Sequence, residues 1–207
     1  MRGLEQLFIL VLPELCTGCK SCEIACAVEH SRTKCIYTAH LEEPRPVPRI
    51  RVLLADGYSV PMRCQHCADA PCMAVCPTKA ISRSPEGFIL LDSAKCIGCL
   101  MCAQACPFGA VRLDTALRVA VKCDFCFERV RQGRQPACVE ACPTRALRFG
   151  TLEELMAQVA GAKAREVLKR LSSEAGILVA KPERERGVET PMSPAFVREM
   201  YRGAGWV

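Results

Sequence analysis

The sequence has few aromatic residues and no apolar run of the length that a membrane span requires. Aromatic residues make up 5% of the 207 residues, and only one tryptophan is present. A transmembrane helix needs about 20 consecutive apolar residues, whereas the first apolar run extends only from Leu7 to Leu12. Residues 8–12 fit a first β-strand better, so membrane insertion is not expected.

Targeting signals are also missing from residues 1–15. The segment lacks the basic region, long apolar core and small-residue cleavage site of a signal peptide, and it has no twin-arginine motif. A partner subunit could still carry such a signal. We therefore expect a cytoplasmic location, where thiols stay reduced and disulfides are rare.

The residue patterns of a catalytic centre are absent as well. We find no nucleophile–base constellation, phosphate loop or open catalytic metal site. The formal charge is +6, but the basic residues are scattered along the chain, unlike the clustered patches of nucleic-acid-binding proteins. The sequence therefore predicts a non-catalytic protein that does not bind nucleic acid.

Cysteine, in contrast, is abundant. The chain has 17 cysteines, which inflate its 50% hydrophobic content, so the remaining apolar core is modest and metal binding is favoured over disulfides. Sixteen of them form four groups of four: Cys16, Cys19, Cys22, Cys26; Cys64, Cys67, Cys72, Cys76; Cys96, Cys99, Cys102, Cys106; and Cys123, Cys126, Cys138, Cys142.

The groups belong to an internal repeat. The segments CPTKAI (76–81), CPFGAV (106–111) and CPTRAL (142–147) share one frame. A [4Fe–4S] cube needs four soft thiolate ligands, and the two-residue gaps let one tight loop wrap three of its corners. Gly18 and Gly98 suit the positive φ or close backbone approach of such a loop. The pattern predicts four [4Fe–4S] clusters with the sixteen cysteines as iron ligands.

Other metal sites fit less well. Zinc ribbons use CxxC pairs, so a CxxCxxC run followed by a fourth cysteine exceeds what zinc needs, and the CxxxCxxC order of radical-SAM clusters is absent. Because each oxidised cluster with its thiolates carries roughly −2, four clusters would lower the net charge to about −2. The basic residues then compensate the clusters.

The fourth cysteine of each group lies beyond reach of its own cube and is expected to bind the paired cluster. Residues 60–115 resemble a complete two-cluster bacterial ferredoxin. In that unit Cys64, Cys67 and Cys72 would share a cluster with Cys106, and Cys96, Cys99 and Cys102 one with Cys76. The outer groups then combine with each other, so that Cys16, Cys19 and Cys22 pair with Cys142, and Cys123, Cys126 and Cys138 with Cys26. The alternative, in which each group binds its own cube, has little geometric support.

Residues 8–150 as a whole resemble the four-cluster electron-transfer subunits of molybdopterin oxidoreductases, certain hydrogenases and formate dehydrogenases. The segments CTGCKSCEIACAVEHS, PRPVPRIRV and VPMRCQHCADAPC are most similar to the iron–sulfur partner of anaerobic nickel CO dehydrogenase. The resemblance implies single-electron transfer from a low-potential catalytic subunit, CO dehydrogenase first, to a hydrogenase, a flavin reductase or another acceptor protein. One rival is a subunit of a molybdenum or tungsten enzyme such as formate dehydrogenase or aldehyde oxidoreductase. A rival of another class is a structural assembly module.

The expected fold is α+β, with two interleaved ferredoxin-like units, one inserted in the other, and a helical C-terminal extension. The four-cluster domain would cover residues 1–150, and the extension and tail residues 151–207. Residues 49–54 and 58–62 predict a hairpin that covers a cluster as a lid, with docking of a partner as a second role. Thr151 to Glu154 has the form of a capping box before an amphipathic helix that Gly161 would interrupt. Further on, residues 176–180, a short helix from Ser193 and the penultimate Trp206 suggest a partner or oligomer contact, the alternative being a tail that packs back over the clusters.

A few residues remain outside this frame. Cys35 is expected to be a tolerated free thiol, the alternatives being a docking contact or a redox-sensitive thiol. His66 would either donate a hydrogen bond to a cluster sulfur or pack beside it, whereas His30 and His40 are expected to be ordinary loop residues. The basic residues next to cluster ligands would tune the cluster potentials or serve solubility: Lys20, Lys95, Lys122 and Arg145.

Overall fold

The computed structural model describes residues 7–174, with side chains described as far as residue 164. Contacts divide the chain into two compact units, residues 1–159 and 160–207, and all sixteen grouped cysteines lie in the first. The predicted elements at residues 176–180, the short helix from Ser193 and the penultimate Trp206 lie outside the described residues. No helix in the described part is long and apolar enough to cross a membrane.

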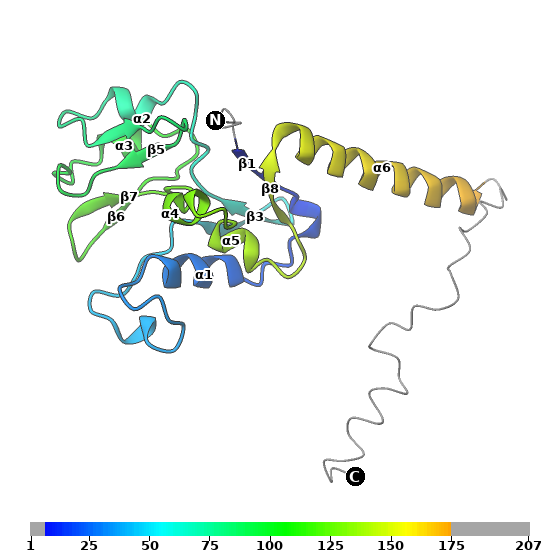
Figure 1. Cartoon of the computed structure of the whole chain (residues 1–207), viewed down its shortest axis with the longest axis horizontal. Helices are drawn as coiled ribbons and strands as arrows, with labels where there is room; N and C mark the ends of the chain where they lie inside the picture. Colours follow the sequence, from blue (N-terminus) through cyan, green and yellow to red (C-terminus); the bar gives the residue numbers. More distant parts are fainter. Residues whose placement is uncertain (1–6, 175–207) are drawn as a thin grey trace, which may run out of the picture. The chain divides into compact units, whose positions relative to one another are not determined.

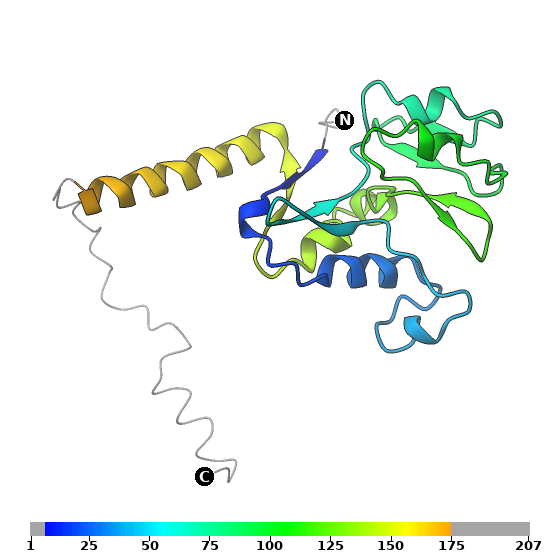
Figure 2. The ribbon, with the colours of Figure 1, turned by 180° about the vertical axis from the view of Figure 1, so that it is seen from behind.

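Four two-stranded antiparallel sheets organise the first unit. The first sheet joins distant parts of the chain, since Leu7 pairs with Thr151 and Val11 with Leu147, and this pair lies side by side in both ribbon views (Figure 1 and Figure 2). The remaining three are local hairpins. The paired strands are β1 (Leu7–Val11) with β8 (Leu147–Thr151), β2 (Arg51–Ala55) with β3 (Tyr58–Met62), β4 (Ile81–Arg83) with β5 (Ile89–Leu91), and β6 (Arg112–Asp114) with β7 (Val119–Val121).

Helices carry a member of every cysteine group. Four of them carry the third cysteine of a group, and each of these thiols is buried: Cys22 in α1 (Ser21–Glu29), Cys72 in α2 (Pro71–Ala74), Cys102 in α3 (Met101–Gln104) and Cys138 in α5 (Ala137–Glu140). The others are η1 (Pro13–Leu15), η2 (Ala39–Leu41), α4 (Phe127–Arg131) and α6 (Leu152–Glu174). The mixture of short helices and small antiparallel sheets confirms the α+β class.

Two hydrophobic cores lie in this unit. One combines residues of the outer segments, including Ile9, Ile50, Phe125 and Leu147, with Phe88 from the middle of the chain. The other uses only the middle of the chain, from Ala70 to Ala120. Cysteines contribute to both cores, so the folded interior of each depends on thiols as well as on aliphatic side chains.

Local predictions are mostly confirmed. The hairpin forms, with its first strand displaced to Arg51–Ala55. The capping box forms too, because Thr151 N donates to Glu154 Oε2 at 2.9 Å and Glu154 N donates to Thr151 Oγ1 at 3.3 Å. The predicted interruption at Gly161 is wrong, since α6 continues through it to Glu174.

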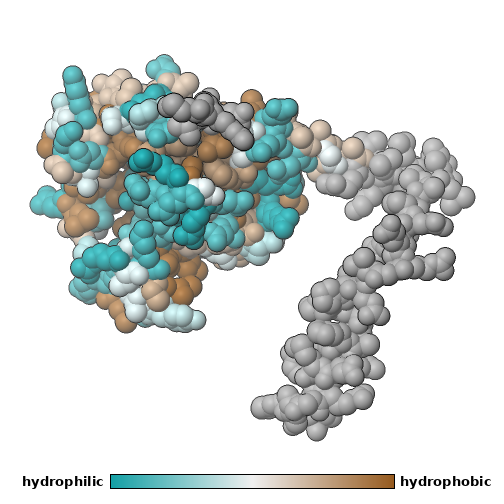
Figure 3. Space-filling view, in the orientation of Figure 1, coloured by the Kyte–Doolittle hydropathy of each residue, from teal (hydrophilic) through white to brown (hydrophobic). Residues whose placement is uncertain are grey.

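The surface is mixed in polarity. Figure 3 shows hydrophobic residues reaching the surface among hydrophilic ones. Exposed apolar side chains include Ile36, Tyr37 and Leu41 in the loop after α1, and Leu54 and Tyr58 on the β2–β3 hairpin.

Candidate iron–sulfur cluster sites

The structure gathers the sixteen grouped thiols at four places, which we call sites A to D. Each site takes three cysteines from one group and one from another. Sites A, C and D are cavities lined by four cysteines each, whereas site B is a buried set of four interacting thiols. Site A contains Cys16, Cys19, Cys22 and Cys142; site B Cys26, Cys123, Cys126 and Cys138; site C Cys64, Cys67, Cys72 and Cys106; and site D Cys76, Cys96, Cys99 and Cys102.

Site B is the most deeply buried of the four. All four of its thiols are buried. The pKa of Cys126 is raised to about 12, mainly by burial and in smaller part by the negative charges of Asp124 and of the neighbouring thiolates Cys123 and Cys26. Burial likewise raises the pKa of Cys138 well above its usual value. Four thiolates so close together in a dry site need a cationic centre, which an iron–sulfur core provides.

The helices explain why one group serves two sites. Cys22 and Cys26 lie one turn apart on α1, yet Cys22 belongs to site A and Cys26 to site B. The same exchange occurs at α2, where Cys72 lies in site C and the following Cys76 in site D. Sites A and B are thus adjacent, as are sites C and D.

Backbone amides point at the thiol sulfurs. Arg49 N lies 3.2 Å from Cys26 Sγ, and Ala120 N lies 3.3 Å from Cys96 Sγ. His66 N and Phe125 N lie 3.4 Å from the sulfurs of Cys64 and Cys123, respectively. Hydrogen bonds of this kind stabilise thiolate charge and tune cluster potentials, so the donor sets fit a [4Fe–4S] cofactor.

Glycine is required in the loop of site D. Gly98 has φ +70°, and a Cβ at this position would lie 2.2 Å from Arg118 O. Such an approach is closer than any side chain tolerates, which confirms the predicted need for a close backbone contact. Gly18 in site A has the same φ of +70°.

His66 is buried between two rings. It makes edge contacts with Phe88 and Phe125, whose ring centroids lie 5.8 Å and 5.3 Å away. Burial, reinforced by the charge of Lys122, lowers its pKa to about 3, so the ring is neutral. Its Nδ1 accepts a hydrogen bond from Ile89 N at 3.0 Å, while Nε2 is buried with no hydrogen-bond partner among the described residues. His66 therefore packs between aromatic rings, as one of the two expectations had it. Its Nε2–H group is left available to donate a hydrogen bond to a sulfur, which was the other.

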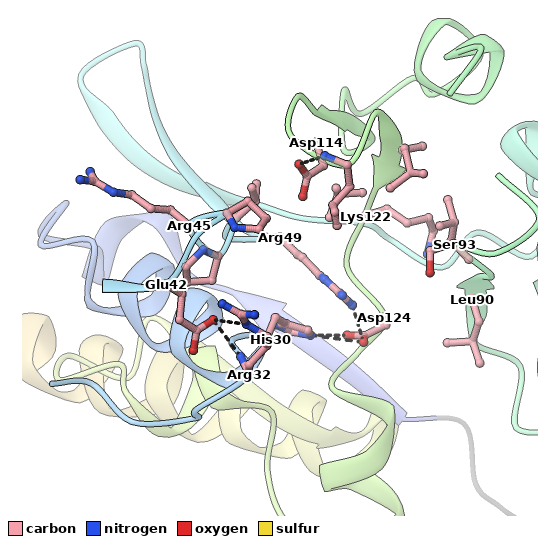
Figure 4. Close-up of a pocket in the computed structure, with 18 of the residues that line it drawn as sticks. His30, Arg32, Glu42, Arg45, Arg49, Leu90, Ser93, Asp114, Lys122 and Asp124 are labelled. Atoms are coloured by element: carbon pink, nitrogen blue, oxygen red, sulfur yellow. Dashed lines mark hydrogen bonds and ion pairs between the residues drawn. The ribbon is translucent and has the colours of Figure 1, made fainter. Parts of the chain in front are cut away.

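The prediction for His30 is wrong, because this residue is part of a half-buried charge network beside site B (Figure 4). Its Nε2 lies 3.1 Å from Asp124 Oδ1, and its Nδ1 lies 2.7 Å from Cys26 O. Arg49 NH1 donates to Asp124 Oδ2 at 2.5 Å. Burial alone would lower the pKa of His30, but the hydrogen bonds to Asp124 and Cys26 and the charge of Asp124 together outweigh it and raise the pKa to about 9. One sequence signal was available: His30 follows Cys26 by four residues, which places both on one helix face. His40 is exposed in η2.

The basic residues next to the ligands differ in burial. Lys122 is 3% exposed, and Arg63, which sequence reasoning missed, is 4% exposed. The side chain of Lys95, in contrast, is 64% exposed and lies 3.4 Å from Asp92. The remaining cysteine, Cys35, lies in the loop after α1 outside the four sites. A hydrogen bond from the backbone of Tyr37 lowers the pKa of its thiol.

Four sets of four convergent thiols, with amides directed at their sulfurs, define an iron–sulfur electron carrier. Residues 55–152 match the family model of the 4Fe-4S dicluster domain. The chain is 40% identical to an iron-sulfur protein of Rhodospirillum rubrum over 177 residues, 80% of this chain and 93% of that protein. It is 38% identical to the thiosulfate reductase electron transfer subunit PhsB of Salmonella typhi over 156 residues (74% and 81%). It is also 38% identical to the B subunit of the anaerobic dimethyl sulfoxide reductase of Escherichia coli over 148 residues (68% and 71%).

The chain belongs to this family of iron–sulfur electron-transfer subunits of oxidoreductase complexes. It is not a catalytic subunit, and its cofactors are four [4Fe–4S] clusters.

Proposed function

We propose that the four cysteines of each site together hold one [4Fe–4S] cluster. Electrons pass from one cluster to the next in the order A, B, C, D. Each cluster, when bound, accepts and releases one electron at a time. Helix α1 connects A to B through Cys22 and Cys26, and the segment from Cys72 in α2 to Cys76 just beyond it connects C to D. Between B and C lie the stacked rings of Phe88 and Phe125, 4.5 Å apart, with His66 against them.

The observation that carries this proposal is the origin of each thiol set from two different cysteine groups. Sites C and D use only residues 64–106, whereas sites A and B combine residues 16–26 with residues 123–142. Two interleaved ferredoxin-like units within residues 1–150 account for this division. Cys19 of site A and Cys99 of site D are exposed thiols, so we assign electron exchange with partners to these two ends.

The catalytic partner that we favour is a molybdenum or tungsten oxidoreductase. The names of two relatives, the dimethyl sulfoxide reductase and thiosulfate reductase subunits, support this choice. CO dehydrogenase is the second candidate, supported by the resemblance of the segments at residues 16–31, 44–52 and 60–72. Cytoplasmic location belongs to the same proposal, because sixteen ligand thiols must stay reduced until iron binds.

Anaerobic mixing tests the partner. The dithionite-reduced protein would be mixed with the isolated catalytic subunit of dimethyl sulfoxide reductase or thiosulfate reductase and its substrate, and reoxidation would be followed optically. In parallel, the oxidised protein would be mixed with CO dehydrogenase and CO, or with formate dehydrogenase and formate. Substrate-dependent reoxidation or formate-dependent bleaching at catalytic enzyme concentration supports the favoured class. Bleaching with CO alone moves the assignment to CO dehydrogenase. Clusters that exchange no electrons in any mixture would leave only the structural-module alternative.

A further inference from the structure

Two buried cations lie between the inner sites B and C. Arg63 immediately precedes Cys64 of site C, and Lys122 immediately precedes Cys123 of site B. They are 4% and 3% exposed. Within the described part of the chain, neither has a carboxylate at salt-bridge distance. A buried charge without an opposite charge is strongly unfavourable, so both residues require a negative partner.

Backbone carbonyls hold the two side chains in equivalent ways. Lys122 Nζ donates to Cys123 O at 2.8 Å and to Ile89 O at 2.5 Å. Arg63 donates to Cys64 O at 2.6 Å and to Ile9 O at 2.5 Å. Arg63 Nε is buried and finds no hydrogen-bond partner among the described residues. These contacts fix the cations in place, but neutral carbonyls do not compensate a full charge.

Each cation reaches the surroundings of the other inner site. Lys122 precedes a cysteine of site B, but its Nζ donates to the carbonyl of Ile89, a residue that lines the cavity of site C. Arg63 precedes a cysteine of site C, but it donates to the carbonyl of Ile9. Ile9 belongs to the same hydrophobic core as Cys26 and Cys138 of site B.

We propose that Lys122 is the charge partner of the cluster at site C and Arg63 that of the cluster at site B. Each positive charge raises the reduction potential of the cluster that it neutralises. The proposal rests on the ligand sets proposed above. Each electron that arrives adds one negative charge to a site that already carries roughly −2. A fixed cation favours that extra charge, and it acts strongly because site B and its surroundings exclude water.

The test uses the reconstituted holoprotein in redox titrations followed by electron paramagnetic resonance. Lys122→Gln and Arg63→Gln remove the charge but keep a hydrogen-bond donor. For a unit charge roughly 10 Å from a cluster and an effective dielectric constant of about 20, loss of the charge changes the equilibrium constant for cluster reduction about tenfold. For a one-electron couple this equals about 59 mV. We expect each variant to lower the reduction potential of one cluster by about that amount. For Lys122→Gln this is the cluster of site C, identified as the one whose signal changes in Cys72→Ser. For Arg63→Gln it is the cluster of site B, identified in the same way with Cys138→Ser.

Charge-preserving and position-matched variants complete the design. Lys122→Arg and Arg63→Lys should leave the potentials near those of the parent protein. Lys95→Gln is the matched control, because Lys95 also precedes the first cysteine of a group but is exposed and paired with Asp92. Unchanged potentials in both Gln variants, or equal shifts in Gln and charged variants, would overturn the proposal.

Iron content distinguishes the possible failures. Four clusters with normal reducibility, but unshifted potentials, would refute the role of the cations and leave the ligand assignment intact. Fewer than four clusters in the parent protein would instead refute the proposed ligand sets. If Lys122→Gln loses iron while Lys122→Arg retains it, the requirement for charge is supported. Loss in both variants would assign Lys122 a purely structural role.

Discussion

Double substitution of cysteines on α1 tests how the sites are divided. Cys22 and Cys26 lie one turn apart on this helix, but Cys22 lines site A with Cys142, whereas Cys26 lies in site B with Cys138. Replacing one thiol by alanine removes a ligand from a single site. We therefore expect each single variant to lose the iron of one cluster, which is about four of roughly sixteen atoms per chain.

The pairs then behave differently. Cys22→Ala with Cys142→Ala affects site A alone, so the double variant should hold as much iron as either single variant, about twelve atoms. Cys22→Ala with Cys26→Ala affects sites A and B, so the loss should be additive and leave about eight atoms. If an alanine variant converts its cluster to a three-iron form instead, the loss per site is smaller but the same pattern of additivity holds.

Iron and acid-labile sulfide per chain measure the outcome after anaerobic reconstitution. Cys35→Ser is the control, because Cys35 lies outside the four sites, and it should retain all of the iron. Additive loss for Cys22 with Cys142, together with non-additive loss for Cys22 with Cys26, would show that each cysteine group binds its own cluster. That result would refute the division into sites A to D.

Three further predictions concern the scaffold around the clusters. Arg129, whose side chain is 10% exposed, forms an ion pair with Glu29 of α1 at 2.7 Å. Arg129→Met should lower the free energy of unfolding by about 3 kcal/mol, because it leaves the carboxylate of Glu29 without this partner. An unchanged denaturation midpoint of the holoprotein would contradict this. Gly98→Ala should deplete the cluster of site D, because the new Cβ meets Arg118 O. Gly133→Ala, at φ +74° with open space around it, should keep full iron content, and equal iron loss in both variants would exclude the steric cause. Removal of iron with a chelator should unfold both hydrophobic cores, because cysteines form part of each core. Far- and near-ultraviolet circular dichroism spectra that stay native after iron loss would argue against this coupling.

The cysteine spacing carries most of the predictable information. Cysteines separated by two residues and followed by a Cys-Pro frame indicate both the ligand type and the repeat. They do so because the ligands within each tight loop are close in sequence. The capping box at Thr151 and Glu154 is predictable for the same reason, since its two hydrogen bonds span only three residues. Gly161 was misleading: glycine in a helix costs about 1 kcal/mol, which the surrounding helix-forming residues of α6 offset.

Contacts between distant segments were not predictable in this way. His30 meets Asp124 across 94 positions and Arg49 meets it across 75, and no local pattern encodes such a meeting. The burial of Lys122 and Arg63 likewise depends on segments far away in the sequence, whose carbonyls their side chains reach. The similarly placed Lys95 remains at the surface. These flanking cations have similar immediate neighbours, so the local sequence does not distinguish the buried ones from the exposed one.

The pairing of β1 with β8 and the composition of site A also affect how the protein is made. Cys16, Cys19 and Cys22 leave the ribosome long before Cys142, the fourth member of their site. At about 5–20 residues per second, the delay between Cys22 and Cys142 is roughly 6 to 24 s. Sites C and D, whose cysteines all lie between residues 64 and 106, are complete earlier. The first thiols to be synthesised are therefore among the last to be enclosed, and during that interval they depend on the cell to keep them reduced.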